Sequence, residues 1–485
     1  MIGRRARTAT PAQTKDPSDG FVQRIALRLA AWMERWFPDT FVFALIAVVI
    51  TGIGAAAIGA SPKAIVTAFG GGFWDLITFT LQVSVVAISG HIVATSPPAQ
   101  RAITWLARIP KNGRQAVAFV ALLATSLSLI NWAISLIFSA LLTKELARRR
   151  PDMDYRAAGA ASFLGLGGVW AMGLSSAPAQ MMANEASMPP SLLPISGVLP
   201  FSQTVFLPQS LLLTGVLIVL TVLIAYMSAP NANRALTAQA MHIDLEYEIR
   251  KEEPRTPRRP GEWFDTSWIL PAIVVTAGAA YLVMVVIDRG WWLALSDLNT
   301  YNFLFIMLGL ALHGTPRKFL KAAASAIPSV GGVLIQFPFY AGVAAILTQA
   351  AAPDGTTLSS TLGHAFSQVA SGSLLAPVLA IYSVVLGIFL PSGGGKWIIE
   401  APYVMQAAND AHLHLGWAVQ VYNAAEALPN LINPFWMLPV LGLLGLRARH
   451  VVGFTFLQFL VHLPVVLIMV WLLSGTLEYI PPVIP

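Results

Sequence analysis

The chain has 485 residues, of which 56% are hydrophobic and only 11% are charged. Soluble globular domains carry roughly 25% charged residues, so this chain has too few ionic groups to cover a soluble surface, and a protein embedded in the lipid bilayer is expected. The formal net charge is +7, but the basic residues lie mainly in loops between apolar segments, which indicates membrane orientation rather than nucleic-acid binding.

Residues 1–37 form a polar, basic N-terminal segment without the apolar core of a secretion signal. Within it, Phe21–Phe37 carries Arg24 and Arg28 one helical turn apart, together with apolar residues at helical spacing. This pattern predicts an amphipathic helix on the cytoplasmic membrane surface. The alternative is that the segment continues the first membrane-spanning helix.

Nine apolar segments follow that are candidates to cross the bilayer, which takes about 20 residues of helix. Two further apolar stretches, Arg114–Leu146 and Ser373–Asn409, are long but interrupted by polar or glycine-rich residues. The nine candidates are Pro38–Ala60, Gly70–Thr95, Tyr155–Asn184, Val205–Ala229, Thr266–Asp288, Leu298–His313, Ser329–Ala351, Leu413–Leu446 and Val451–Ser474.

The loop charges favour one topology, because loops rich in Lys and Arg face the cytoplasm. The basic loops, within 101–114, 144–156, 231–262, 317–321 and 447–449, fall on one side only if both interrupted stretches enter the membrane and turn back. The sequence thus predicts an all-α membrane protein with about nine transmembrane helices and two re-entrant hairpins. It is expected in a bacterial inner membrane, with a cytoplasmic N-terminus.

The order of elements repeats along the chain. Gly59–Lys63 ends the first crossing and Gly314–Lys318 ends a later one; each is followed by an amphipathic stretch, a crossing, an interrupted hairpin and a broken helix. The charge rule gives the two copies opposite orientations, as in the inverted repeats of many secondary transporters. The predicted divisions are a first repeat over 38–229, a cytoplasmic linker over 230–265, a connecting helix over 266–297 and a second repeat over 298–485.

Four polar interruptions lie at matching places in the two copies, at two hairpin tips and two helix breaks. N–H groups freed there attract anions, and freed carbonyls or Asn and Ser oxygens hold cations. A single interruption is commonly a mere kink, whereas four matched ones indicate a binding site. The candidate residues are Ser128 and Asn131 at the first tip, Ser392, Gly393, Gly394 and Gly395 at the second tip, Ser175 and Ser176 at the first break, and Asn430 and Asn433 at the second break.

Ionisable residues at membrane depth are functional candidates. Lys396 and Glu400 are four residues apart and share a helix face, and Glu426 lies one turn before Asn430. In one interpretation, Lys396 forms a structural ion pair with Glu400 or Glu426. In the other, Lys396 faces a substrate carboxylate, while Glu426, helped by Asn430 and Ser392, carries a proton or binds a coupling cation.

The sequence does not indicate an enzyme. His412 and His414 form a His-x-His pair without an evident third ligand, so no metal site is predicted. Zinc-protease, nucleophile-elbow and ATP-binding motifs are absent. No cofactor is expected beyond Na⁺ or H⁺ as a coupling ion. Two functions remain open: a secondary transporter for a small carboxylate, or a passive channel or facilitator for small organic anions.

Several short stretches are distinctive: PSGGGKW (Pro391–Trp397), LINW (Leu129–Trp132) with DYR (Asp154–Arg156), and NLINPFWMLP (Asn430–Pro439). Together they resemble the bacterial short-chain fatty acid transporter family, which includes acetoacetate and butyrate permeases and is grouped with a larger ion transporter superfamily. The resemblance covers most of the chain, from Phe37 to Leu473.

This resemblance implies uptake of a short monocarboxylate with protons or sodium ions, by a homodimer whose substrate domain slides as an elevator against a scaffold. It places Asn131 and Ser392–Gly395 at the hairpin tips, and it places at the helix breaks Ser175, Ser176, Asn430 and Asn433. Lys396 departs from the family pattern, which has glutamine, and Glu400-Ala401-Pro402 stands where Gln-Gly-Pro is usual. The two changes fit a compensating pair. A lysine there could replace a bound cation or accept a different acid.

Overall fold

The computed structural model describes residues 40–482 apart from 190–191, 246–258, 292–293, 295–296, 371, 390–392 and 434. Within those residues every regular element is a helix, and no strand is present. The all-α fold class is therefore confirmed. The predicted amphipathic helix over Phe21–Phe37 and the predicted site residue Ser392 lie outside the described residues.

The described helices fall into two series, before and after the linker. The first series is α2 (Thr40–Ala57), α3 (Pro62–Gly72), α4 (Ile77–Ala94), α5 (Pro97–Leu106), α6 (Gly113–Ile130), α7 (Trp132–Arg149), α8 (Tyr155–Ala161), α9 (Leu164–Gly168), η1 (Trp170–Met172), α10 (Ala177–Met182), η2 (Glu185–Ser187), α11 (Leu193–Ser196), η3 (Phe201–Gln203), α12 (Pro208–Ser228) and η4 (Ala232–Arg234). The second series is α13 (Glu262–Thr266), α14 (Ile269–Arg289), α16 (Leu298–His313), α17 (Pro316–Ala326), η5 (Ile327–Val330), α18 (Gly331–Gln349), α19 (Leu358–Val369), η6 (Gly372–Leu374), α20 (Leu375–Phe389), α21 (Gly393–Asp410), α22 (Leu415–Ala427), η7 (Leu428–Leu431), η8 (Phe435–Met437), α23 (Leu438–Leu444) and α24 (Ala448–Ser474).

The helices are interrupted where the sequence places polar residues. Residues 155–184 form α8, α9, η1 and α10 in succession, and 413–446 form α22, η7, η8 and α23. The two interrupted stretches each form a pair of helices, α6 with α7 and α20 with α21. Helices α6 and α7 pack against each other, so the chain reverses direction at Asn131. That the two pairs re-enter the membrane without crossing it stays a prediction.

Side-chain caps set several helix starts by accepting hydrogen bonds from free backbone N–H groups, which is important where lipid replaces water. One carboxylate oxygen of Asp154 begins α8 by accepting from the N–H groups of Arg156 and Ala157, both at 3.0 Å. Its other oxygen accepts from the Leu236 N–H in the linker at 2.9 Å. The DYR stretch therefore ties the linker to the start of α8.

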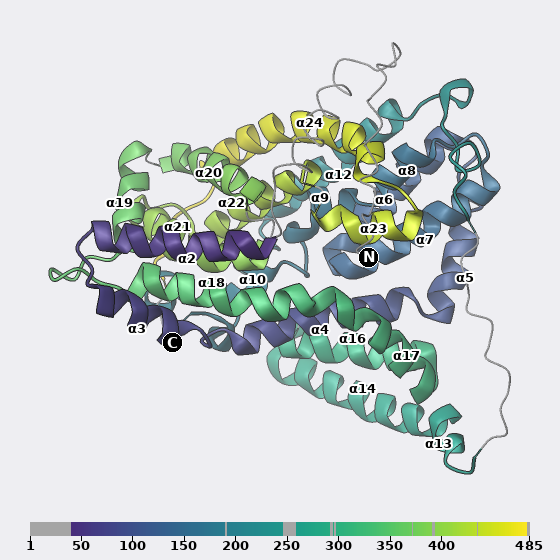
Figure 1. Ribbon diagram of the computed structural model, residues 1–485, viewed down its shortest axis with the longest axis horizontal. Coiled ribbons are helices and arrows are strands. Elements are labelled where there is room, and N and C mark those ends of the chain that lie inside the picture. Colours follow the sequence, from purple (N-terminus) through teal and green to yellow (C-terminus); the bar gives the residue numbers. More distant parts are fainter. Residues whose placement is uncertain are drawn as a thin grey trace, which may run out of the picture.

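Figure 1 shows how the helices are grouped. Helices α14, α16 and α17 lie together at one edge, next to α4, while α2 and α3 pack on α18. Helices α20, α22 and α24 form another group, and α21 lies against α18, α19 and α22. Because α21 is enclosed in this way, Gly393–Met405 is buried without interruption.

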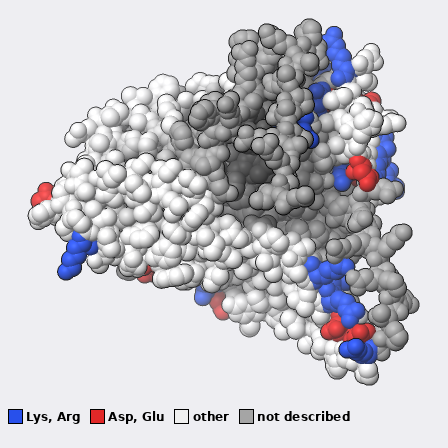
Figure 2. All heavy atoms as spheres, viewed as in Figure 1, with Lys and Arg blue, Asp and Glu red and all other residues white. Residues whose placement is uncertain are grey.

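The described residues contain six helices long and apolar enough to cross a membrane, namely α4, α6, α12, α14, α18 and α24. Shorter apolar helices span Ala44–Ala57, Leu298–His313 and Gly372–Ile388. Helix α14 exposes Ile273 and Ile287 by 62% and 75%, as expected of a lipid-facing helix. Figure 2 shows a broad uncharged belt between charged residues at the two ends of this face. The chain is a multi-pass membrane protein, while nine crossings and the predicted orientation stay predictions.

We predict that both helix pairs are re-entrant. The chain has no cysteine, so the labelling of one introduced cysteine reports the side of the membrane on which that residue lies. Lys111→Cys and Arg149→Cys, which flank α6 and α7, should react with a membrane-impermeant maleimide only from the cytoplasmic side, because their loops are basic. Ser373→Cys and Asp410→Cys, which flank α20 and α21, should react only from the outer side.

The cysteine-free parent gives the labelling background in the same membranes. If positions 373 and 410 reacted from opposite sides, α20 and α21 would together cross the bilayer, and the predicted topology would be wrong.

Candidate functional site

The first hairpin tip is held by Asn131, the residue between α6 and α7. Its Oδ1 caps α7 by accepting from the N–H groups of Ala133 at 2.9 Å and Ile134 at 3.0 Å. Its Nδ2 donates to the Tyr301 hydroxyl of α16 at 3.2 Å, and that hydroxyl donates to the Ile130 carbonyl at 2.5 Å. Asn131 thus fixes the shape of the tip. That Asn131 also contacts the substrate stays a prediction.

The first break lies directly on this tip. The Ser175 hydroxyl donates to the Ser128 carbonyl at 2.9 Å, so the structure brings these two predicted residues together. Ser176 caps α10 by accepting from the Ala179 N–H at 3.2 Å. Gly173 makes the approach possible, because a Cβ on it would lie 2.2 Å from the Leu129 carbonyl oxygen.

The second tip ends in the glycine-rich start of α21, which meets the start of α10. A Cβ on Gly394 would lie 3.2 Å from the Cβ of Ala177. A Cβ on Gly393 would lie 2.4 Å from Cζ2 of Trp170 and 2.9 Å from Oε2 of Glu426. These contacts leave no room for a side chain at position 393 and place the α21 start beside a buried carboxyl group.

The second break makes contacts that match those of the first. The Asn433 Nδ2 donates to the Ile388 carbonyl, near the end of α20, at 3.1 Å, as Ser175 donates to a carbonyl near the end of α6. The ring of Trp132, which begins α7, lies 5.7 Å from that of Trp436 after the second break. The second helix of each hairpin therefore begins against the break of the other half: α7 against the second break and α21 against the first.

A buried ionic cluster lies on α21 and its neighbours. Lys396 Nζ is 3.2 Å from Oε1 of Glu400, and it donates to the carbonyl and hydroxyl oxygens of Ser383 on α20 at 2.9 Å and 2.6 Å. It also lies 4.5 Å from the centre of the Tyr422 ring on α22. Lys396 and Glu400 are both completely buried. The predicted pairing of Lys396 with Glu400 is therefore present, and the ammonium group has a partner for each of its three protons.

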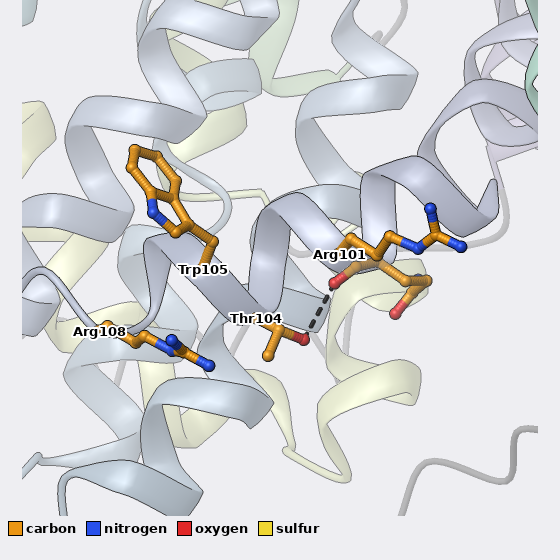
Figure 3. Close-up of a pocket in the computed structure, with 5 residues that line it drawn as sticks. Arg101, Thr104, Trp105 and Arg108 are labelled. Carbon is orange, nitrogen blue, oxygen red and sulfur yellow. Dashed lines mark hydrogen bonds between the residues drawn. The ribbon is translucent and has the colours of Figure 1, made fainter.

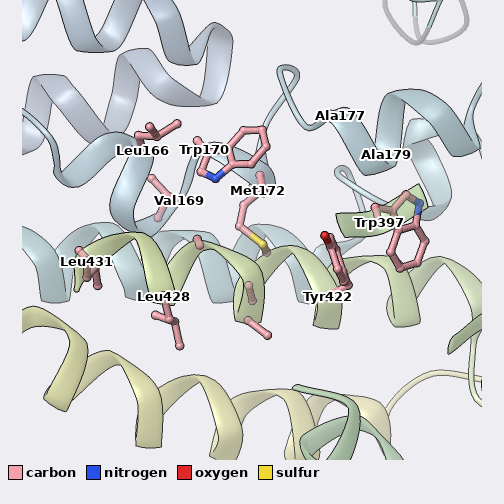
Figure 4. Packing of buried hydrophobic residues seen from close by; sticks show 14 of the residues in the cluster. Leu166, Val169, Trp170, Met172, Ala177, Ala179, Trp397, Tyr422, Leu428 and Leu431 are labelled. Carbon is pink, nitrogen blue, oxygen red and sulfur yellow. The ribbon is translucent and has the colours of Figure 1, made fainter. Parts of the chain in front are cut away.

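Glu426 is the second carboxyl group of this cluster and lies on α22, one turn after Tyr422. Its Oε2 has no hydrogen-bond donor at bonding distance, although the Trp170 indole and Asn430 lie against the carboxyl group. The Glu400 Oε2 and Asn430 Oδ1 oxygens and the Trp170 Nε1 also lack partners. Figure 4 shows Trp170, Tyr422 and Trp397 on the same side of α22. The predicted residues Glu426, Asn430 and Lys396 are thus close neighbours.

Some residues of the cluster carry no sequence signal that predicts them. Ser383 comes from the apolar helix α20 and Trp170 from the short helix η1. Tyr422 could have been found, since it is four residues before Glu426 on one helix face. His414, considered above as half of a His-x-His pair, caps α22 by accepting from the Trp417 N–H at 3.1 Å.

Two pockets lie away from these residues. One, of 330 Å³, is a shallow surface depression on α5 lined by Gln100, Arg101, Thr104, Trp105 and Arg108 (Figure 3). The other, of 250 Å³, lies where residues 198–203 meet 414–416 and 480–482.

We predict that Gly173→Ala lowers the thermal unfolding midpoint in detergent. The added methyl group would push the first break away from the hairpin tip, and such overpacking costs about 1–3 kcal/mol. Gly215→Ala on α12 is the matched control, because a Cβ there meets nothing within 4 Å. Equal midpoints for the two variants would contradict the close contact between break and tip.

We also predict that Lys396→Gln destabilises the protein and that adding Glu400→Gln restores most of the loss. A buried charge without its partner costs about 3–5 kcal/mol, whereas replacing both partners is often neutral. Lys318→Gln, at an exposed lysine on α17, should change little. The unfolding midpoints of the four proteins test this, and a double variant no more stable than Lys396→Gln alone would argue against a structural pair.

Comparison with known proteins points to one family. The family model described as "Short chain fatty acid transporter" matches residues 21–473. A protein of Escherichia coli strain K12, provisionally named a short-chain fatty acid transporter, is 29% identical over 89% of this chain and 96% of its own length. A protein of Haemophilus influenzae with the same provisional name is 27% identical over 92% of this chain and 99% of its own length.

Two solved structures have a similar fold. The YdaH transporter of Alcanivorax borkumensis has a TM-score of 0.55 at 17% identity and covers 93% of this chain and 98% of its own. MtrF of Neisseria gonorrhoeae, described as representing a class of antimetabolite efflux pumps, has a TM-score of 0.55 at 16% identity, with 95% and 98% covered. At this identity the likeness shows the fold alone. The family match covers nearly the whole chain, and the protein therefore belongs to the short-chain fatty acid transporter family, a family of membrane transporters and not of enzymes.

Proposed function

We propose that the protein is a secondary active symporter that takes up short-chain fatty acids, or similar small monocarboxylates, together with protons or sodium ions. The observation that carries this proposal is the meeting of the glycine-rich start of α21 with the start of α10, beside the buried Lys396–Glu400 pair and Glu426. Such a place combines N–H groups that attract a carboxylate with ionisable groups at membrane depth. The family supplies the class of substrate.

In this proposal the substrate carboxylate binds to the first-turn N–H groups of α21. The first N–H groups of a helix attract anions, and Gly393 and Gly394 at the start of α21 carry no side chain that would keep a carboxylate away from the backbone. Polar groups of the two breaks, Ser175, Ser176, Asn430 and Asn433, complete the site. A short acyl chain suits the space, because Trp170 and Phe337 lie close to the glycines.

The matching contacts of the two halves support two inverted repeats that work by alternating access. Each hairpin is tied to the break of its own half by a side-chain hydrogen bond, so a hairpin and a break are suited to move as one body. We propose that these bodies slide as an elevator against the remaining helices, in a homodimer in the bacterial inner membrane. Large apolar residues exposed on α2 and α14 are available to contact lipid or a second copy.

Uptake into proteoliposomes tests the proposed function. We expect uptake of labelled acetoacetate to be faster than in protein-free liposomes and to be stimulated by an imposed proton or sodium gradient. Acetoacetate is the better probe, since the less polar butyric acid crosses lipid unaided. Protein-free liposomes under the same gradients provide the background rate.

Uptake that only equilibrates the acid, whatever gradient is imposed, would indicate a passive facilitator. No uptake of any small acid above background would contradict the proposed function altogether.

A further inference from the structure

The buried cluster contains one cationic group and two carboxyl groups. Lys396 is committed to Glu400 and Ser383, so Glu426 has no cation of its own at contact distance among the described residues. The titratable groups that face it are Lys396 and Glu400 from α21 and Tyr422 from α22. Tyr403 from α21 and Tyr382 from α20 lie next to Glu400. Every one of these groups except Lys396 is neutral or negative.

An ionised carboxylate with no counter-charge is costly in a protein interior and in a membrane. Glu426 is 2% exposed, so water does not offset that cost. The group must therefore either carry a proton or share its site with a bound cation. The partnerless Oε2 oxygen points to the same conclusion, because buried polar atoms without partners are rare in folded proteins.

The groups around Glu426 favour a proton over a metal cation. Hard cations bind to oxygen acceptors, and the cluster offers the partnerless Glu400 Oε2 and Asn430 Oδ1. However, the Trp170 indole, an N–H donor without another partner, lies against the Glu426 carboxyl group and would face any metal ion bound there. The Lys396 ammonium group nearby would repel a metal ion. Among the described residues there is no group of three or more His, Asp or Glu that could hold a metal. A proton needs neither extra ligands nor extra volume.

The position of Glu426 links this proton to the substrate. Its Oε2 lies 2.9 Å from the place of a Cβ on Gly393, against the first turn of α21. The first-turn N–H groups of α21 are the proposed binding place for the substrate carboxylate. An ionised Glu426 and a substrate carboxylate would therefore occupy adjacent positions and repel each other.

We propose that Glu426 is the proton-coupling residue, an inference that rests on the proposed function. The carboxylate of Glu426 takes one proton from the outer solution and becomes a neutral carboxylic acid, which lets the substrate carboxylate dock at the α21 start. After reorientation the substrate leaves to the cytoplasm, and Glu426 releases its proton there. One proton therefore accompanies each monocarboxylate, and Lys396 with Glu400 stays paired throughout.

Glu426→Gln tests the proposal, because glutamine imitates the protonated acid and cannot release a proton. We expect substrate exchange between acetoacetate pools at equal pH to stay within about twofold of wild type, since exchange needs no proton release. We expect initial uptake driven by a pH gradient to fall at least about tenfold. The variant cannot release a proton to the cytoplasm, so the empty transporter cannot return to face the outer solution. Glu426→Asp should retain gradient-driven uptake, and Glu185→Gln, at an exposed position, should resemble wild type.

A second measurement needs no substrate and separates the two proposals. A pH jump on membrane-adsorbed proteoliposomes should give a transient charge displacement in the wild type that Glu426→Gln lacks. If wild type and Glu426→Gln gave the same displacement, or if Glu426→Gln still accumulated acetoacetate with a pH gradient, Glu426 would not be the coupling residue. Uptake driven by sodium alone would likewise overturn the proton assignment. If Glu426→Gln lost the displacement but the wild type transported no acid, the proton site would stand and the proposed function would be refuted.

Discussion

The requirement that every backbone N–H and C=O group find a partner away from water governs this structure. Long apolar helices meet it within themselves. At four places the helices stop inside the protein, and side chains or the facing chain take over. Asn131 caps α7 and holds the tip through Tyr301, and Ser175 and Asn433 donate to carbonyl groups near the ends of α6 and α20. Each break is thereby joined to the hairpin tip of its own half by a side-chain hydrogen bond.

The ionic cluster has a second consequence for function. A buried pair such as Lys396–Glu400 is seldom a net source of stability, because both ions lose their hydration. What it does provide is a fixed charge environment for its neighbours. The Lys396 ammonium donates its protons to Ser383 and Glu400, and it makes no ion pair with Glu426. The pair therefore leaves Glu426 dependent on something that can come and go, which is the property a coupling residue requires.

The sequence predicted features that depend on local pattern. Apolar length located the long helices, and a separation of four residues predicted the Lys396–Glu400 pair. Length could not separate crossings from hairpin arms: α6 in a predicted hairpin has 18 residues, and the predicted crossing α16 has 16. Helices enclosed by protein need not match the thickness of the bilayer. Ser383 and Trp170 were not predictable, because their roles arise from packing between elements distant in the chain.

The contact of Gly393 with Trp170 bears on how the acyl-chain preference could evolve. A single methyl group at position 393 would collide with the indole ring, so this position is closed to gradual change. Enlarging the proposed site for bulkier acids would have to begin at Trp170, yet its indole also lies against Glu426. Substrate range and ion coupling would then shift together, so variants selected for transport of longer acids should often take up the acid without coupling it to the ion gradient.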